Sequence, residues 1–154
     1  MAANKVKTFL DSHGVKYVSI RHSAAFTAAE VAASVHVAGR DFAKTLIVNL
    51  DDERVMVVLP ATRRLLLGEL REMLECEHAR LANEAEFQDL FPDCEPGAPP
   101  PFGNLYGMKV YVAADLAHES EIAFNAGTHT EVIKMSYADF DRLVQPLVLQ
   151  YVTT

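Results

Sequence analysis

The clearest hydrophobic pattern of the chain lies in residues 42–59, where two apolar stretches flank a polar turn. Residues 42–48 (Phe-Ala-Lys-Thr-Leu-Ile-Val) are rich in β-branched and aromatic side chains, which is typical of a strand. Residues 55–59 are apolar without alternation, as expected of a strand that is covered on both faces. The turn at residues 51–54 therefore predicts a central β-hairpin that ends at Pro60.

Turn residues and hydrophobic spacing divide the rest of the chain into short helices and strands. Helical spacing predicts helices at residues 3–13, 27–35, 66–75, 83–90 and 136–144. Further strands are predicted at residues 15–21, 109–113, 121–125, 130–135 and 147–152. Strands that follow one another directly are mixed with helices, which excludes a doubly wound parallel sheet. The sequence predicts one α+β domain over residues 1–154, with a mixed β-sheet surrounded by helices.

One lysine interrupts an otherwise apolar strand face. Alternation places Lys44 on the same face as Phe42, Leu46 and Val48. An ammonium on such a face is costly unless it is paired, neutralised or opened to a cleft. Lys44 could therefore lie near the strand end and reach water along its flexible stem, or it could be held in a pocket that binds a substrate.

A proline-rich segment is the second unusual feature. Residues 93–103 contain four prolines and two glycines, a composition that excludes helix and sheet and predicts a loop. Gly97 and Gly103 would let the backbone approach a ligand closely. The prolines would hold the loop in one shape at low entropic cost. The alternative is a surface crossing that the prolines merely stiffen.

Composition narrows the class of protein. Half of the 154 residues are hydrophobic, which is enough for a proper core, and no long apolar run or signal-peptide pattern occurs. We therefore expect a soluble, cytoplasmic protein without membrane contact. Cys76 and Cys94 stand in no C-x-x-C or zinc spacing, and no two histidines form an H-x-H or H-x-x-x-H pair. We expect reduced thiols, no bound metal and no cofactor.

The net charge of −7 argues against a protein that coats nucleic acid in general. The charge is uneven, because residues 1–76 carry ten of the fourteen Lys and Arg residues and only nine of the twenty-one acidic ones. One interpretation is a local basic surface around Arg40, Lys44, Arg63 and Arg64. The other is an ordinary solvated face.

The order of several short motifs resembles the YbaK / prolyl-tRNA-synthetase-associated domain family, the trans-editing aminoacyl-tRNA deacylases that include ProX. The matching motifs are His22 with Thr27-Ala28-Ala29-Glu30, Lys44-Thr45-Leu46, the apolar strand that ends at Pro60, Gly97-Ala98-Pro99-Pro100-Pro101 with Phe102-Gly103, the turn Ala126-Gly127-Thr128-His129, and a strand with a helix that begins at Ser136. Each motif is short, but their order and spacing cover nearly the whole chain.

The resemblance implies a partly barrel-like sheet and hydrolysis of the ester between a wrong amino acid and the 3′-terminal ribose of tRNA. Lys44 matches the essential lysine of the family, and Gly97 and Pro101 match the loop whose backbone lies beside the scissile ester. The family needs no Ser or Cys nucleophile, because water attacks or the neighbouring ribose 2′-hydroxyl assists. Ester hydrolysis needs charge stabilisation, which a lysine in a low-dielectric site would supply.

The resemblance also suggests which residues surround a small acyl pocket. The candidates are Phe26, Thr27, Thr45, Phe102, Gly103 and His129. For Phe26 the alternative is core packing, and for Thr27 it is a helix cap, since Thr27 and Glu30 form a capping-box pattern. For His129 the alternative is an exposed turn histidine. Such a pocket predicts removal of alanyl, seryl, threonyl or cysteinyl groups from tRNA-Pro or a related tRNA, with prolyl-tRNA spared.

The predicted partner is the acceptor end of an aminoacyl-tRNA. A synthetase or an elongation factor is a further candidate, because the acidic chain would bind tRNA weakly. No synthetase domain accompanies the motifs, so we expect action in trans. The aspartate that in the family often follows the strand after the proline loop is displaced here to Asp115. The main alternative is a non-catalytic module that binds tRNA or a synthetase. An unrelated ester or amide hydrolase is disfavoured, because the sequence contains no G-x-S-x-G or Cys-His motif.

Overall fold

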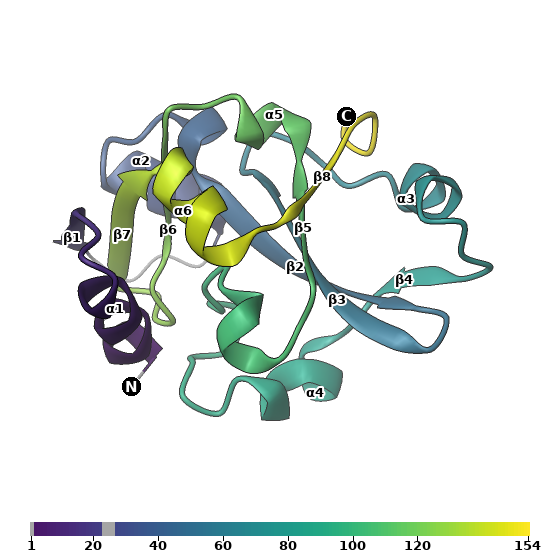
Figure 1. The fold of residues 1–154 in the computed structure, drawn as a ribbon, viewed down its shortest axis with the longest axis horizontal. Coiled ribbons are helices and arrows are strands. Elements are labelled where there is room, and N and C mark those ends of the chain that lie inside the picture. The colour runs from purple at the N-terminus through teal and green to yellow at the C-terminus, as the bar shows by residue number, and fades with distance from the viewer. Residues whose placement is uncertain (1, 23–26) are drawn as a thin grey trace.

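The computed structural model describes residues 2–22 and 27–154, which form two β-sheets flanked by short helices (Figure 1). The α-helices are α1 (Ala2–Ser12), α2 (Ala28–Ser34), α3 (Leu67–Met73), α4 (Glu84–Phe87), α5 (Ala114–Ala117) and α6 (Tyr137–Val144). The strands are β1 (Tyr17–Arg21), β2 (Ala43–Leu50), β3 (Glu53–Pro60), β4 (Ala79–Leu81), β5 (Val110–Ala113), β6 (Glu121–Asn125), β7 (Glu131–Ser136) and β8 (Leu147–Leu149). The predicted α+β class is confirmed.

The larger sheet is mixed and has the strand order β4-β2-β3-β5-β8. In it β2 pairs antiparallel with β3 and β4, whereas β5 pairs parallel with β3 and β8. The smaller sheet is antiparallel, with the order β1-β7-β6. An isolated parallel bridge between Phe42 and Ala123 joins the two. The predicted single sheet is thus divided in two, with β8 at one edge of the larger sheet and β6 at one edge of the smaller sheet.

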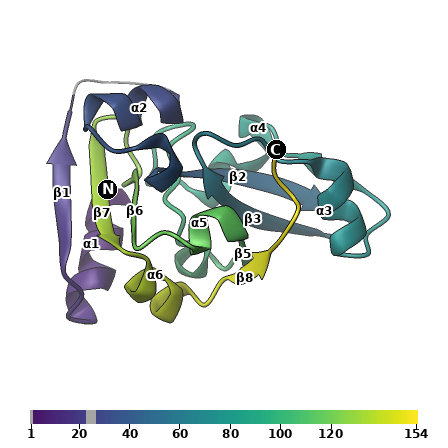
Figure 2. The same ribbon diagram turned by 90° about the horizontal axis from the view of Figure 1, so that it is seen from above.

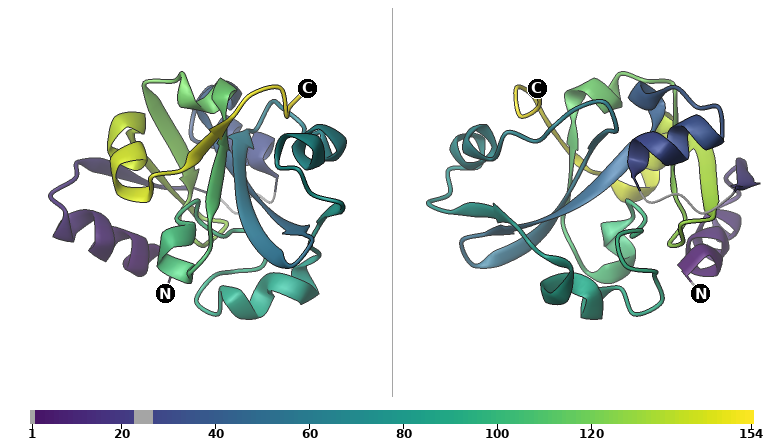
Figure 3. Two further views of the ribbon diagram at one scale, coloured as in Figure 1. Left: turned by 45° about the vertical axis from the view of Figure 1, so that its right-hand side comes forward. Right: turned by 180° about the vertical axis from the view of Figure 1, so that it is seen from behind.

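The predicted central hairpin is confirmed. Strands β2 and β3 pair over their full length, and the hairpin crosses the molecule diagonally (Figure 3). Residues 55–60 are all buried. Met56 and Val58 belong to one hydrophobic cluster, whereas Val55 and Val57 belong to another. The apolar run without alternation therefore reflects a strand that has a hydrophobic cluster on each face.

The helices divide between the two sheets. Helices α1, α2 and α6 lie around the smaller sheet, and α3 and α4 lie beside the larger one (Figure 1 and Figure 2). The two groups meet where the bridge at Phe42 joins the sheets, directly before β2 begins. Lys44 is the second residue of β2 and therefore lies at this junction.

Short elements account for the differences from the predicted secondary structure. The sequence pattern does not predict β4 or α5, and the helix predicted at residues 83–90 is one turn of α-helix, α4, followed by a 3₁₀ turn at Gln88–Leu90. Strand β4 has only three residues and exists through its pairing with β2. An element of three or four residues is too short to produce a hydrophobic period. In the described ranges, no helix is both long and apolar enough to cross a membrane.

Candidate functional site

Lys44 lies between two hydrophobic clusters rather than inside one. Its neighbours on the same strand face, Phe42 and Val48, belong to separate clusters, and Lys44 is half-buried. Burial lowers the pKa of the Lys44 ammonium, and the nearby Arg64 guanidinium lowers it further. Among the residues that the structure describes, no carboxylate forms an ion pair with Lys44. The site is a partly desolvated cation that has no counter-ion in the part of the chain that the structure describes.

The four basic residues that could form one basic surface have different surroundings. Arg63 Nε pairs with the displaced Asp115, at 3.2 Å from its Oδ2. Arg40 acts electrostatically on the carboxyl of Glu119, which also shares a hydrogen bond with Asp41. This leaves Lys44 and Arg64 as the two members without an acidic partner in the described part of the chain.

Thr45 faces away from Lys44, as predicted. Its neighbours on the same face, Ala43 and Ile47, belong to the largest hydrophobic cluster, and so does its cross-strand partner Val58. Thr45 is half-buried, which leaves part of its side chain accessible on that face. Its predicted role in substrate binding stays a prediction.

The second part of the proline-rich loop is buried and is not a surface crossing. Residues 98–103 are all buried, whereas Gly97 is exposed and has a φ of +79°, a conformation that glycine adopts readily. Phe102 is fully buried and packs edge-on against the ring of Phe140 in the core. A β-carbon on Gly103 would lie 2.6 Å from Val110 Cγ2, so only glycine fits there. Phe102 and Gly103, predicted to bind substrate, are thus placed to anchor the loop, and Gly97 belongs to its exposed part at residues 95–97.

The turn at residues 126–129 fixes the start of this loop. His129 is buried, its backbone N–H donates to Glu95 Oε1 at 2.8 Å, and its ring Nε2 lies 2.6 Å from the carbonyl oxygen of Pro96. Because a carbonyl oxygen only accepts, Nε2 is the donor. The Glu95 N–H donates to the carbonyl of Gly127 at 2.8 Å. The expectation of an exposed turn histidine is therefore wrong, since His129 is packed against the loop.

The bridge between the sheets brings Lys44 towards this turn. Because Phe42 and Ala123 pair in parallel, β2 and β6 run in the same direction from the bridge. Lys44 lies two residues after Phe42, and Asn125 lies two residues after Ala123. The turn at 126–129 begins directly after Asn125 and holds the proline loop through Glu95. Lys44 and the start of the turn thus follow the same bridge, two residues after Phe42 and three residues after Ala123, and the turn in turn holds the loop.

The end of β1 lies beside the 126–129 turn. The N–H of His22 donates to the carbonyl of Thr130 at 2.9 Å, next to the 126–129 turn. Thr27 forms the predicted capping box, because its hydroxyl accepts from the N–H of Glu30 at 3.1 Å and its own N–H donates to Glu30 Oε1 at 3.2 Å. The Thr27 hydroxyl therefore serves the helix start. Phe26 lies outside the described residues.

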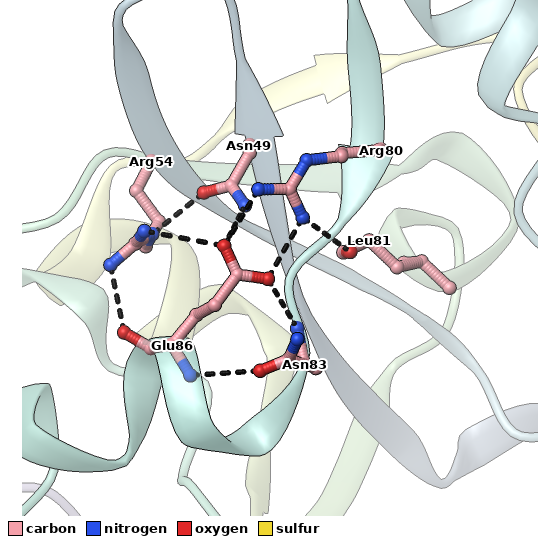
Figure 4. Close-up of polar contacts among 6 residues, drawn as sticks. All are labelled: Asn49, Arg54, Arg80, Leu81, Asn83 and Glu86. Atoms are coloured by element: carbon pink, nitrogen blue, oxygen red, sulfur yellow. Dashed lines mark hydrogen bonds and ion pairs between the residues drawn. The ribbon is translucent and has the colours of Figure 1, made fainter.

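A polar network centred on Glu86 fixes α4 to the far end of β2 (Figure 4). The Glu86 carboxylate accepts from both terminal nitrogens of Arg80, at 2.8 and 2.7 Å, and from Asn49 Nδ2 at 3.1 Å. Arg54 donates to Asn49 Oδ1 at 2.7 Å and to the Glu86 carbonyl at 2.9 Å. The hydrogen bonds from Arg80 and from the backbone of Asn83 lower the pKa of Glu86 to about 2. The sequence indicated only the cap formed by Asn83 and Glu86, which is confirmed.

The same helix borders the exposed part of the proline loop. A β-carbon on Gly97 would lie 3.2 Å from Glu84 Oε1 and 3.7 Å from His129 Cε1. Glu84 is the first residue of α4, the helix that Glu86 ties to β2. The Glu86 network therefore connects the strand that carries Lys44 with the helix beside Gly97.

A hollow of about 720 Å³ lies between the turn of the hairpin, α3 and β4, and its lining includes both arginines and carboxylates. A second, of only about 10 Å³, lies between α4 and the loop. Cys76 and Cys94 are free thiols in the structure, and burial raises the pKa of Cys94 to about 11. In the described residues, no group of three His, Cys, Asp or Glu side chains is placed to hold a metal ion.

Known proteins share both sequence and fold with this chain. The model of the family described as "Aminoacyl-tRNA editing domain" matches residues 22–143. The Multifunctional Ser/Thr-tRNA deacylase ProXp-y of Escherichia coli strain K12 is 33% identical over 102 residues, and so is that of Escherichia coli O157:H7. These matches cover 65% of this chain and 60% of the relatives, so the chain spans about three fifths of their length.

Solved structures show the same fold. The hypothetical protein APE2540 has a TM-score of 0.84 at 24% identity, with 97% of this chain and 99% of that chain covered. A provisionally assigned trans-editing enzyme for prolyl tRNA synthetase has a TM-score of 0.82 at 22% identity, with coverage of 97% and 95%. Lys44, the proline loop and the 126–129 turn all lie within the matched residues 22–143. The chain therefore belongs to the aminoacyl-tRNA editing domain family, as its motif order predicts.

Proposed function

We propose that this protein is an aminoacyl-tRNA deacylase that removes a small, wrongly attached amino acid from tRNA. The observation that carries the proposal is the half-buried Lys44 ammonium, which has no acidic partner among the described residues and lies two residues beyond the bridge that joins the two sheets. The family of editing domains and the 33% identity to a Ser/Thr-tRNA deacylase support it.

The reaction needs an attacking oxygen, a leaving ribose oxygen and a cation for the charge that develops. Water attacks the carbonyl carbon of the aminoacyl ester, or the neighbouring ribose hydroxyl assists the attack. The bond between the carbonyl carbon and the ribose oxygen breaks, and the proton lost by water ends on the ribose oxygen. Lys44 stabilises the negative charge on the substrate, which a preorganised cation does well in a partly dry site. Gly97 and Pro101 supply loop backbone beside the ester.

The loop favours a small acyl group. Residues 98–103 are buried and contain three prolines, so this wall of the site cannot move without disturbing the core. A wall of this kind excludes large groups by volume, but a single methylene changes binding by only about 1–3 kcal/mol. Thr45 and His129 add polar groups near the junction, which favours a hydroxyl-bearing or alanyl substrate. We propose alanyl, seryl, threonyl or cysteinyl groups on tRNA-Pro or a related tRNA, with prolyl-tRNA spared.

A panel of aminoacyl-tRNAs tests this function. Single-turnover release is measured for alanyl, seryl, threonyl, cysteinyl, prolyl, leucyl and phenylalanyl esters, with Lys44→Ala as the control. We expect release of one or more small groups by the wild-type protein and almost none by Lys44→Ala. Preference for leucyl or phenylalanyl would overturn the size argument, and tRNA binding without any release would instead identify a non-catalytic module. A synthetase or an elongation factor as partner stays a prediction.

A further inference from the structure

We propose that Arg64 binds a phosphate of the tRNA acceptor end beside Lys44, and that residues 152–154 hold Arg64 in place for this contact. The inference rests on the proposed function. It also separates two arginines that are neighbours in the sequence, Arg63 and Arg64, and assigns substrate contact to only one of them.

The two arginines have different electrostatic surroundings. Arg63 Nε pairs with Asp115 Oδ2 at 3.2 Å, and the same carboxylate oxygen accepts from the Thr153 hydroxyl at 2.8 Å. Arg64 is exposed and forms no ion pair with any residue of the described ranges. In the hairpin Lys44 pairs with Leu59, five residues before Arg64, and the Arg64 charge contributes to lowering the pKa of the Lys44 ammonium. Two neighbouring cations without an acid between them are stabilised when an anion binds between them.

The backbone of Arg64 is fixed although its side chain is exposed. The chain turns directly after β3, where the N–H of Arg63 donates to the carbonyl of Pro60 at 3.0 Å. Arg64 then forms two backbone hydrogen bonds with Thr154. The N–H of Arg64 donates to the carbonyl of Thr154 at 3.1 Å, and the N–H of Thr154 donates to the carbonyl of Arg64 at 2.9 Å. An antiparallel bridge joins Leu65 to Thr153. Because both its N–H and its carbonyl are already hydrogen-bonded to Thr154, Arg64 loses little further backbone freedom when it binds a ligand.

The ligand that fits this pair is a phosphodiester. A guanidinium donates two parallel hydrogen bonds to phosphate oxygens, and the adjacent ammonium adds a point charge. The substrate of the proposed reaction carries phosphates within a nucleotide of the scissile ester. Contact with one of them would orient the 3′ end, so that the ester meets Lys44 and the Gly97 loop. Arg64 is in this sense a positioning residue rather than a catalytic one.

The test measures binding of a fluorescent acceptor-stem RNA hairpin that ends in single-stranded CCA, over a series of salt concentrations. For Arg64→Gln we expect about 10-fold weaker binding and a salt slope smaller by about 0.7, the value for one phosphate of a single strand. Arg64→Lys should keep the slope, because it keeps the charge. Arg63→Gln is the matched control from the same turn and should lower thermal stability while it leaves the salt slope unchanged.

A second hairpin without CCA locates the contact. Arg64→Gln and wild-type protein should bind this hairpin equally, since the proposed phosphate is missing. The inference would be overturned if Arg64→Gln and wild type had the same salt slope on the CCA hairpin. It would also be overturned if Arg63→Gln and Arg64→Gln lost the same amount of binding affinity. Deacylation of a small aminoacyl-tRNA is measured in parallel. If wild-type protein deacylates and the KM of Arg64→Gln is unchanged, only this inference fails. If the wild-type protein releases no amino acid, the proposed function itself fails.

Discussion

The two ends of strand β2 hold charged groups in opposite arrangements. At the end near Asn49, each charge has a partner, because Glu86 accepts from Arg80 and Asn49 while Arg54 donates to Asn49 and the Glu86 carbonyl. At the other end, Lys44 is half-buried beside Arg64, with no acidic partner in the described chain. Strand β2 thus contributes Asn49 to a network of paired charges and Lys44 to a cationic site, and four residues separate the two.

The difference separates a structural role from a functional one. Exposed paired charges contribute little to stability individually, but a network with several hydrogen bonds fixes the position of a helix. An unpaired, partly desolvated cation costs stability and is retained where it meets a charged ligand. We therefore expect substitutions at the Glu86 end to change folding, and substitutions at the Lys44 end to change activity.

The largest effect is expected for Lys44→Ala. This change should lower the single-turnover rate of deacylation by about 10²–10³-fold, the usual result of removing one group that stabilises charge in the transition state. The variant should fold as well as wild type, because an unpaired ammonium is removed from a half-buried position. Rates are measured together with thermal unfolding.

The control at the other end of β2 is Arg80→Ala. It removes the two hydrogen bonds to Glu86 and should lower the unfolding temperature, while the deacylation rate changes by less than about 3-fold. A folded Lys44→Ala protein with wild-type turnover, or an Arg80→Ala protein that loses activity without losing stability, would contradict the comparison.

Gly97→Ala tests the loop. Gly97 has a φ of +79°, and an added β-carbon would meet Glu84 Oε1 at 3.2 Å. The matched control is Gly107→Ala, with a φ of +67° and no neighbouring atom within 4 Å. Both variants should lose about 1 kcal/mol of unfolding free energy, because alanine disfavours the left-handed conformation. Only Gly97→Ala should slow deacylation, by about 10-fold, and equal rates for both variants would show that the loop position is not important.

His129→Ala tests how firmly the turn holds the loop. The substitution removes the hydrogen bond from the ring to the Pro96 carbonyl, 2.6 Å away. A net hydrogen bond is worth about 0.5–1.5 kcal/mol, so we expect the rate of deacylation to fall by about 2- to 10-fold. His129→Gln keeps an N–H donor and should recover part of the rate. If the two variants have the same rate, this hydrogen bond does not position the loop.

The smallest effect is expected from Glu86→Gln and depends on pH. The pKa of Glu86 in the folded protein is about 2, below its ordinary value of 4.5. The stabilisation by its ionised form is therefore complete above pH 4.5 and is lost as pH falls towards 2. The unfolding temperature of Glu86→Gln should vary less with pH in this window than that of wild type. Parallel curves for the two proteins would show that Glu86 ionises normally.

Local patterns in the sequence determined several features of this protein. Alternation placed Lys44 and Thr45 on opposite faces of one strand, and the unbroken apolar run marked β3 as a strand buried on both faces. The pairs Thr27 with Glu30 and Asn83 with Glu86 indicated the starts of α2 and α4. These features could be predicted because each depends on residues within a few positions of one another.

Only the tertiary structure decided which distant residues meet. The sequence does not distinguish Arg63 from Arg64, because their surroundings come from Asp115 and Thr154 far along the chain. Nor does it show that His129 is buried against Pro96, or that Glu95 binds the turn. Nor does it show that β1, β6 and β7 form a sheet of their own. Such contacts arise from long-range packing, on which the local periodicity of a sequence carries no information.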